Sequence, residues 1–378
     1  MPGQILQLPG DARTELSYLQ SDSIQAIITS PPYLGLRNYS VEPSWWGEGM
    51  DCQHDLLTIL PPGARSVDSK PGPLQTPGTV GRDQWQSQFC SSCQGFCGQL
   101  GGEPDVQTYT RDLLMILNAC KRVLSPTGVL WLVLGDTYAG PSKGSGGKTK
   151  KQLTSAGTFF DRGQHLNEVP GKNLLGVPWE VALALRSAGW YLRSSIIWSK
   201  PNPMPESMKD RPERSYEYIF MLTKSPRYKY HKSAVPEARL NVWPMQAEPT
   251  GIPHYAAFPT ELVRRCILLS TDPGDMILDP FAGIGTTNLV AQRLDRPSVY
   301  VEPSAEYNEL FVIRLKQAQA QEQQNGNTVR GQARQALRGE GNPSRGGQRG
   351  EDGEEDGEDG GGAEGEEQET LSPGVESP

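Results

Sequence analysis

The sequence predicts an α/β fold built on a mainly parallel sheet with helices on both faces. Strand-like apolar runs alternate with helix-like segments along most of the 378 residues, which is the pattern of parallel strands joined by crossover helices. Two of these runs end in short motifs rich in proline or glycine. Ligands of open α/β sheets bind at the carboxyl ends of strands, so both motifs are candidates for the functional site.

The expected elements follow one another in a regular order. The expected strands are residues 4–8, 26–29, 129–134, 192–198, 216–222, 276–278 and 298–301. The expected helices are residues 106–124, 178–188, 260–270, 287–294 and 305–317. Three long irregular stretches separate them, at 38–105, 139–173 and 225–257. Loops of that length inside a compact α/β domain are usually functional.

The composition divides the chain into a folded part and a tail. Hydrophobic residues make up 36% of the chain, with eight Trp and thirteen Tyr, but residues 319–378 are rich first in Arg and Gly and then in acidic residues, with little apolar surface to bury. We therefore expect one folded domain at 1–318 and a disordered tail at 319–378.

The charge of the folded part is mildly basic. The net charge is −8, from 36 basic and 44 acidic residues. Residues 351–378 hold 12 of the acidic residues and no Lys or Arg, which leaves 36 basic and 32 acidic residues in 1–350. This balance permits a polyanionic partner. The first residues carry neither a basic segment nor a long apolar run, so we expect a soluble, cytoplasmic protein.

The first motif is Thr29-Ser30-Pro31-Pro32-Tyr33, which follows the apolar run 24–28. Two consecutive prolines exclude a helix and end strand pairing. The motif therefore predicts a rigid corner that presents an aromatic ring at the end of a core strand.

The second motif lies in residues 275–304, which read as strand, glycine-rich turn, helix and strand. Gly283 and Gly285 let the backbone approach a ligand closely, and Glu302, at the end of the second strand, is placed to hold a ribose diol. The third glycine of a pyrophosphate-binding fingerprint is replaced by Asn288. The loop is thus expected to hold a nucleoside without a pyrophosphate.

Together the two motifs resemble those of the DNA amino-methyltransferases, which transfer a methyl group from S-adenosylmethionine to N4 of cytosine or N6 of adenine. That family has a cofactor loop F-x-G-x-G, present here from Phe281 to Gly285, and a catalytic loop [DNS]-P-P-[YFW], present here from Ser30 to Tyr33. The catalytic loop comes first, as in the circularly permuted β class. The similarity covers roughly residues 4–316 and points to phage and prophage enzymes in particular.

The resemblance implies a fold and a set of site residues. The fold is a doubly wound, mostly parallel, seven-stranded sheet of the Rossmann-like S-adenosylmethionine-dependent methyltransferases. The catalytic residues would be Ser30, Pro31, Pro32 and Tyr33. The cofactor-binding residues would be Asp11, Asp279, Phe281, Gly283, Gly285, Thr286 and Glu302, where Asp11 resembles the residue that contacts the cofactor adenine.

The motif also suggests how the reaction would proceed. An enzyme that acts on the amino group of a base in a duplex takes the base out of the stack. Tyr33 would stack on that base, while the Ser30 hydroxyl and the Pro31 carbonyl accept its N–H groups. A serine at the first position is more typical of cytosine N4 in this family, so we expect that atom, with adenine N6 as the alternative.

The expected partner is double-stranded DNA, contacted by basic residues in and around the long loops. The setting would be a bacterial or phage-infected cytoplasm, and the resemblance also allows a homodimer and a cognate restriction enzyme. An RNA or protein-glutamine methyltransferase usually places its cofactor loop first. A catalytically dead DNA-binding scaffold would show damage at the motif residues, and none is visible. No cysteine follows a proline, as the nucleophile of C5-cytosine methyltransferases does.

Four of the six cysteines are clustered in the insertion at 38–105. A C-x-H pair and a C-x-x-C pair there match a tetrahedral structural zinc site. The expected ligands are Cys52, His54, Cys90 and Cys93, with Cys97 as a spare; the alternative is a set of ordinary reduced thiols. Cys120 and Cys266 lie in segments with a helical pattern and are expected to be buried apolar residues.

Overall fold

A computed structural model describes most of the domain and part of the insertion. The described residues are 3–35, 41–47, 52, 56–58, 88–90, 92–93, 95–139, 169–203, 205–206, 208–248 and 258–320. The chain divides into two compact units, Met1–Glu322 and Gln323–Pro378, and the fold below is that of the first. Most of the predicted tail and residues 140–168 lie outside the described ranges.

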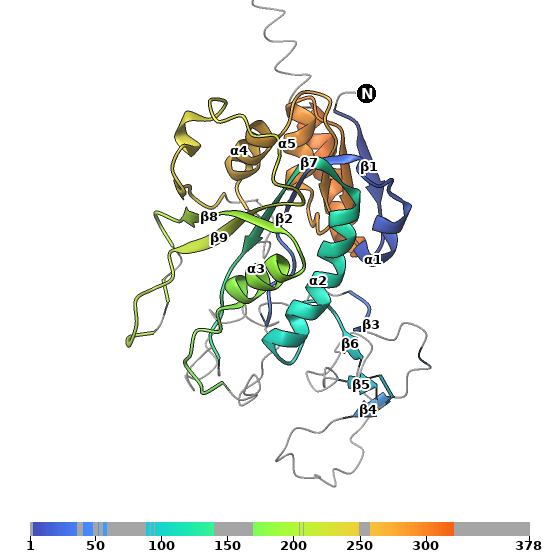
Figure 1. The fold of residues 1–378 in the computed structure, drawn as a ribbon, viewed down its shortest axis with the longest axis vertical. Coiled ribbons are helices and arrows are strands. Elements are labelled where there is room, and N and C mark those ends of the chain that lie inside the picture. Colours follow the sequence, from blue (N-terminus) through green and yellow to red (C-terminus); the bar gives the residue numbers. More distant parts are fainter. Residues whose placement is uncertain are drawn as a thin grey trace, which may run out of the picture. The chain divides into compact units, whose positions relative to one another are not determined.

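The central sheet is mainly parallel, as predicted (Figure 1). Within the described residues its order is β1-β12-β11-β2-β7-β9-β8-β10. The strands are β1 (Ile5–Leu8), β2 (Ile24–Thr29), β7 (Leu124–Leu134), β8 (Tyr191–Ser199), β9 (Tyr216–Thr223), β10 (Val242–Pro244), β11 (Ile277–Asp279) and β12 (Ser298–Val301). β9 is antiparallel to both of its neighbours, and the other pairs are parallel.

The prediction of seven strands was one strand short. The additional strand, β10, pairs with the outer edge of β8. It contains three residues and ends at Pro244, so it lacks the length and the alternating pattern by which a strand is predicted from sequence.

Helices cover both faces of the sheet (Figure 1). They are α1 (Ala12–Glu15), α2 (Val106–Val123), α3 (Val177–Ser187), α4 (Thr260–Ser270) and α5 (Thr286–Arg293), and residues 305–320 are also helical. Side chains of β7 alternate between the two faces: Leu130 and Leu132 pack in the cluster with α2 and α3, while Val129 and Trp131 pack in the cluster with α4. Both faces of the sheet are therefore core, which explains its nearly continuous apolar strands.

The direction of winding reverses between β11 and β2, which are parallel neighbours. The chain leaves β2 through α2 toward β7, and it leaves β11 through α5 toward β12 on the other side. Such a switch point opens a crevice at the carboxyl ends of the two strands. The proline motif follows β2 and the glycine motif follows β11, so both motifs lie at this crevice.

The insertion contains a small antiparallel sheet, β3-β6-β5-β4. Its strands are β3 (Ser44–Trp46), β4 (Leu56–Thr58), β5 (Gln88–Cys90) and β6 (Phe96–Gly98). The sequence predicted no regular structure here, because three-residue strands are too short to show a period. None of the helices in the described ranges is long and apolar enough to cross a membrane.

Candidate active site

The proline motif is held to the rest of the core by hydrogen bonds at both ends. Thr29, the last residue of β2, is fully buried, and its hydroxyl donates to Asp279 Oδ1 at 2.7 Å. Three residues later, the Pro32 carbonyl accepts a hydrogen bond of 2.9 Å from the Tyr109 hydroxyl on α2. The corner between them is therefore fixed to two different elements.

The glycine motif needs its glycines for two different reasons. Gly283 and Gly285 both have positive φ, +52° and +75°, which favours glycine. A Cβ on Gly283 would meet no atom within 4 Å, whereas a Cβ on Gly285 would overlap the ring of Phe311. Gly283 thus lies beside open space, and Gly285 is covered by the core.

Asp279 connects the two motifs. Its carboxylate is buried and accepts hydrogen bonds from the Thr29 hydroxyl, the Thr287 hydroxyl at 2.7 Å and the backbone N–H of Phe281 at 3.1 Å. Burial raises the pKa of Asp279 to about 6, against the lowering effect of these three hydrogen bonds. This residue fixes the distance between the end of β2 and the turn after β11.

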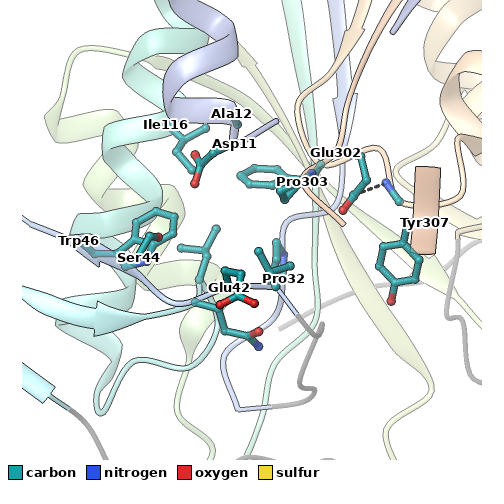
Figure 2. Close-up of a pocket in the computed structure, with 15 residues that line it drawn as sticks. Asp11, Ala12, Pro32, Glu42, Ser44, Trp46, Ile116, Glu302, Pro303 and Tyr307 are labelled. Atoms are coloured by element: carbon teal, nitrogen blue, oxygen red, sulfur yellow. Dashed lines mark hydrogen bonds between the residues drawn. The ribbon is translucent and has the colours of Figure 1, made fainter. Parts of the chain in front are cut away.

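An open cleft of about 700 Å³, including the solvent at its mouth, lies at the switch point (Figure 2). Figure 2 shows Asp11, Ser44 and Trp46 on one side of it and Glu302, Pro303 and Tyr307 on the opposite side. The lining residues are Asp11, Ala12, Pro32, Val41, Glu42, Ser44, Trp46, Gln99, Leu100, Ile116, Phe281, Gly283, Glu302, Pro303 and Tyr307. Apolar walls with a few carboxylates are typical of small-molecule sites.

Glu302 is the most buried carboxylate of the lining, with 6% of its surface exposed. It accepts hydrogen bonds from the backbone N–H groups of Gly283, at 2.9 Å, and Ser304, at 2.8 Å. Burial raises the pKa of Glu302 to about 7, and the nearby Asp279 adds to the effect. A ligand that donates hydroxyl groups to this carboxylate would stabilise its ionised form.

The insertion contributes one wall of the cleft, and Arg13 attaches that wall to the domain. The Arg13 guanidinium donates to both oxygens of Asp11 and to the Ser44 hydroxyl and Trp45 carbonyl of β3. It also lies 3.8 Å from the centre of the Trp46 ring. The same contacts orient Asp11, which in addition accepts the backbone N–H of Arg13 at the start of α1.

The predicted site residues divide into two groups. Those that line the cleft are Asp11, Pro32, Phe281, Gly283 and Glu302. Those that are not part of its lining are Ser30, Pro31, Tyr33, Asp279, Gly285 and Thr286. In the second group, Asp279 and Gly285 shape the turn, and the Thr286 hydroxyl accepts a hydrogen bond of 3.3 Å from Arg314.

Several lining residues were missed by the sequence analysis. Glu42, Ser44, Trp46, Gln99 and Leu100 belong to the insertion, which we had predicted as an irregular metal-anchored segment. Pro303 follows Glu302 directly and Tyr307 lies five residues after it, and their place just beyond a strand end is a signal that could have identified them.

Three of the predicted metal ligands lie together. The sulfur atoms of Cys52, Cys90 and Cys93 are all within 4.8 Å of one another. The distance between Cys52 Sγ and Cys90 Sγ is 3.7 Å, and Cys93 Sγ accepts the backbone N–H of Gly95 at 3.4 Å. His54 lies outside the described residues. Cys97 is not in this group.

The other two cysteines are buried, as predicted. Cys120 and Cys266 are both fully buried within the helices α2 and α4. Burial raises the pKa of both thiols, which therefore remain protonated. They act as small core residues.

A family model described as a DNA methylase, of the N6/N4 methyltransferases, matches residues 24–312. The chain belongs to this N6/N4 DNA methylase family. It is 37% identical over 315 residues to the type II methyltransferase M.Cfr9I of Citrobacter freundii, which covers 81% of this chain and 86% of the relative. It is 34% identical over 319 residues to the type II methyltransferase M.SmaI of Serratia marcescens, with coverages of 81% and 89%.

A solved structure supports the same fold for this N6/N4 methylase. PvuII DNA methyltransferase, described as cytosine-N4-specific, has a TM-score of 0.53 and 18% identity, and the match covers 83% of this chain and 88% of that one. The predicted family, fold and enzyme class are thus confirmed, and the protein is a DNA amino-methyltransferase. The more specific similarity to phage enzymes, the cytoplasmic location, the homodimer and the restriction enzyme stay predictions.

Proposed function

We propose that this methylase binds S-adenosylmethionine in the cleft at the switch point and methylates N4 of a cytosine flipped out of double-stranded DNA. The observation that carries the proposal is the hydrogen bond between Thr29 and Asp279. It joins the motif that would hold the base to the turn that would hold the cofactor. A transfer reaction between two bound groups depends above all on their relative position.

The residues of the cleft fit the proposed cofactor. Trp46, Leu100 and Phe281 provide apolar surface suited to the adenine. Glu302 is a buried acceptor with a raised pKa, suited to a ribose diol. Gly283 has no side chain to fill the open space beside it, so a ligand can approach the backbone there.

The chain itself would bind and orient the base. The cofactor supplies an electrophilic methyl group when it is bound. The Pro32 carbonyl already accepts a hydrogen bond from Tyr109, so we assign the Ser30 hydroxyl and the Pro31 carbonyl as acceptors for the two amino protons. With these protons held in the plane of the base, the lone pair of the nitrogen points out of it, and no covalent intermediate with the protein is needed.

The choice of cytosine depends on Ser30. In the family that these motifs resemble, serine at this position is more typical of cytosine N4, and aspartate of adenine N6. A neutral hydroxyl accepts one N–H bond without adding a charge beside the base, whereas a carboxylate is a stronger acceptor. Either group can serve either base, so the assignment requires a direct measurement.

The test is mass spectrometry of DNA that the purified enzyme has methylated. We expect N4-methylcytosine. Formation of N6-methyladenine alone would show that the target is adenine, and 5-methylcytosine would contradict the mechanism. Ser30→Ala should remove most of the rate while the affinity for S-adenosylmethionine stays unchanged, which separates a loss of base binding from a loss of cofactor binding.

We also propose a structural zinc ion at Cys52, Cys90 and Cys93, with His54 as the fourth ligand. Tetrahedral coordination with Zn–S bonds of about 2.3 Å places two sulfurs about 3.8 Å apart. The observed distance between the Cys52 and Cys90 sulfurs is 3.7 Å, far above the roughly 2.05 Å of a disulfide. Purified protein should contain about one zinc per chain, and Cys90→Ser with Cys93→Ser should remove it. Full activity in a metal-free wild-type preparation would refute this role.

A further inference from the structure

Tyr33 is held in place by more than its own loop. Its ring lies against the backbone of Gly135, just after β7, where an added Cβ would be 2.8 Å from the Tyr33 Cε2 atom. Its carbonyl lies against Gly101, where an added Cβ would be 2.9 Å away. Gly135 therefore bears on the ring and Gly101 on the backbone of Tyr33, and a side chain at either position would force a shift.

The hydroxyl of Tyr33 reaches a second part of the sheet. It donates a hydrogen bond of 2.7 Å to Glu217 Oε2, in β9. β9 is separated from β2 by β7 (Figure 1). A residue of the proline motif is therefore connected across the sheet to the β8–β9 pair.

Glu217 is itself fixed by a cation. Its other oxygen, Oε1, forms an ion pair with the Lys200 ammonium, just beyond the end of β8. Lys200 is held by its backbone N–H, which donates to the Ser215 carbonyl at 2.7 Å, and its ammonium lies 4.5 Å from the centre of the Trp198 ring. Only 18% of the Glu217 side chain and 24% of the Lys200 side chain are exposed.

The Tyr33 ring does not need its hydroxyl in order to stack on a base. Base stacking uses the face of the ring, and phenylalanine provides the same face. The hydroxyl of Tyr33 instead fixes the direction in which the ring points. A hydrogen bond to a partly shielded carboxylate in an ion pair is directional and stronger than one between neutral groups.

We propose that Glu217, held by Lys200, is a positioning residue that sets the orientation of the Tyr33 ring toward the target base. This inference rests on the proposed function, in which Tyr33 stacks on the flipped base. Glu217 acts through Tyr33 and not on the reacting atoms. Its loss should therefore slow methyl transfer in the saturated complex and leave cofactor affinity unchanged.

The experiment is a double-mutant cycle on Tyr33→Phe and Glu217→Ala. The rate of a single turnover is measured with saturating DNA and S-adenosylmethionine. Each single variant should be slower by about tenfold, because each removes the same charged hydrogen bond. The double variant should also be slower by about tenfold and not a hundredfold, because residues that act through one interaction are not additive.

Two further variants separate positioning from a general effect on the fold. Glu217→Gln keeps an oxygen that can accept from Tyr33 and should recover part of the rate lost in Glu217→Ala. Tyr216→Phe removes an exposed hydroxyl from the same strand and should behave like the wild type. Fluorescence of 2-aminopurine placed beside the target cytosine reports the unstacking that accompanies base flipping, and it should change with Tyr33→Phe and Glu217→Ala but not with Tyr216→Phe.

The possible results distinguish this inference from the proposed function. A wild-type protein that methylates no base would refute the function, and an active Tyr33→Ala variant would refute the role of Tyr33. If Tyr33→Ala is inactive while Tyr33→Phe and Glu217→Ala both react at the wild-type rate, only the positioning role is refuted. Independent, multiplying losses in the cycle would refute it as well. If Glu217→Ala does not fold, Tyr33→Phe decides alone, since it removes the same hydrogen bond.

Discussion

Replacing each of the two glycines of the turn after β11 by alanine should separate cofactor binding from folding. In Gly285→Ala the new methyl group overlaps Phe311, which is fully buried and stacked on Tyr300 at a centroid distance of 4.2 Å, so it cannot move aside. Overpacking costs about 1–3 kcal/mol, and the left-handed backbone adds about 1–2 kcal/mol. We expect the free energy of unfolding to fall by about 2–5 kcal/mol.

Gly283→Ala is the matched control, because its backbone is also left-handed but its Cβ has open space around it. Only the backbone cost of about 1–2 kcal/mol applies. The methyl group would point into the cleft, where Gly283 donates to Glu302, so we expect the affinity for S-adenosylmethionine to fall by tenfold or more.

The assay is thermal or urea unfolding of both variants, together with cofactor titration by calorimetry. The expected pattern is a strong loss of stability in Gly285→Ala and a strong loss of binding in Gly283→Ala. Wild-type affinity in Gly283→Ala would refute the placement of the cofactor in this cleft. Equal stabilities of the two variants would refute the packing account of Gly285.

Three more predictions concern the cleft and the core contact beneath it. Because burial raises the pKa of Glu302 to about 7, the carboxylate is mostly ionised at pH 8 and mostly protonated at pH 6. The dissociation constant of the cofactor should therefore rise up to about tenfold as the pH falls from 8 to 6. In Glu302→Gln, calorimetry should find a dissociation constant that no longer changes over this pH range. Arg13→Lys keeps the charge but loses the planar guanidinium that joins Asp11 to Ser44. Cofactor affinity should fall roughly tenfold with little change in melting temperature. An unchanged affinity would contradict the role of the insertion as a wall of the cleft. Asp279→Ala removes the acceptor of the Thr29 hydroxyl and the Phe281 N–H and leaves the Thr287 hydroxyl with the Ile28 carbonyl at 3.3 Å; it should cost about 2–4 kcal/mol of unfolding free energy. Asp279→Asn can accept from Thr29 and donate to Thr287, so it should cost clearly less in urea unfolding.

Long periodic elements and strand-end motifs could be predicted from the sequence. The helix α2 was expected at 106–124 and spans Val106–Val123, because its apolar face repeats over five turns and Asp105 caps its start. The meeting of the Ser30 and Gly283 loops could also be predicted, since each follows a core strand and parallel strands end at one edge of a sheet.

The wall contributed by the insertion could not be predicted in the same way. Trp46 and Leu100 lie in or just beyond strands of three residues, too short for any period to be read. The position of Trp46 depends on the contacts of Arg13 with β3, which link residues more than 30 positions apart. The direction of the Asp279 carboxylate was also beyond reach, because the same residue at a strand end can face a ligand or, as here, two buried threonines.

The two sides of the site are supported by different parts of the chain, and this has a consequence for how variants should behave. The cofactor side is completed by the insertion through Arg13 and Trp46, whereas the base side is completed by β9 through Glu217 and Tyr33. The contact that joins the two sides is the hydrogen bond from Thr29 to Asp279, deep in the core. Changes at Arg13 or at Glu217 should therefore affect one ligand alone, whereas changes at this core contact should affect the alignment of both ligands, even though neither Thr29 nor Asp279 lines the cleft.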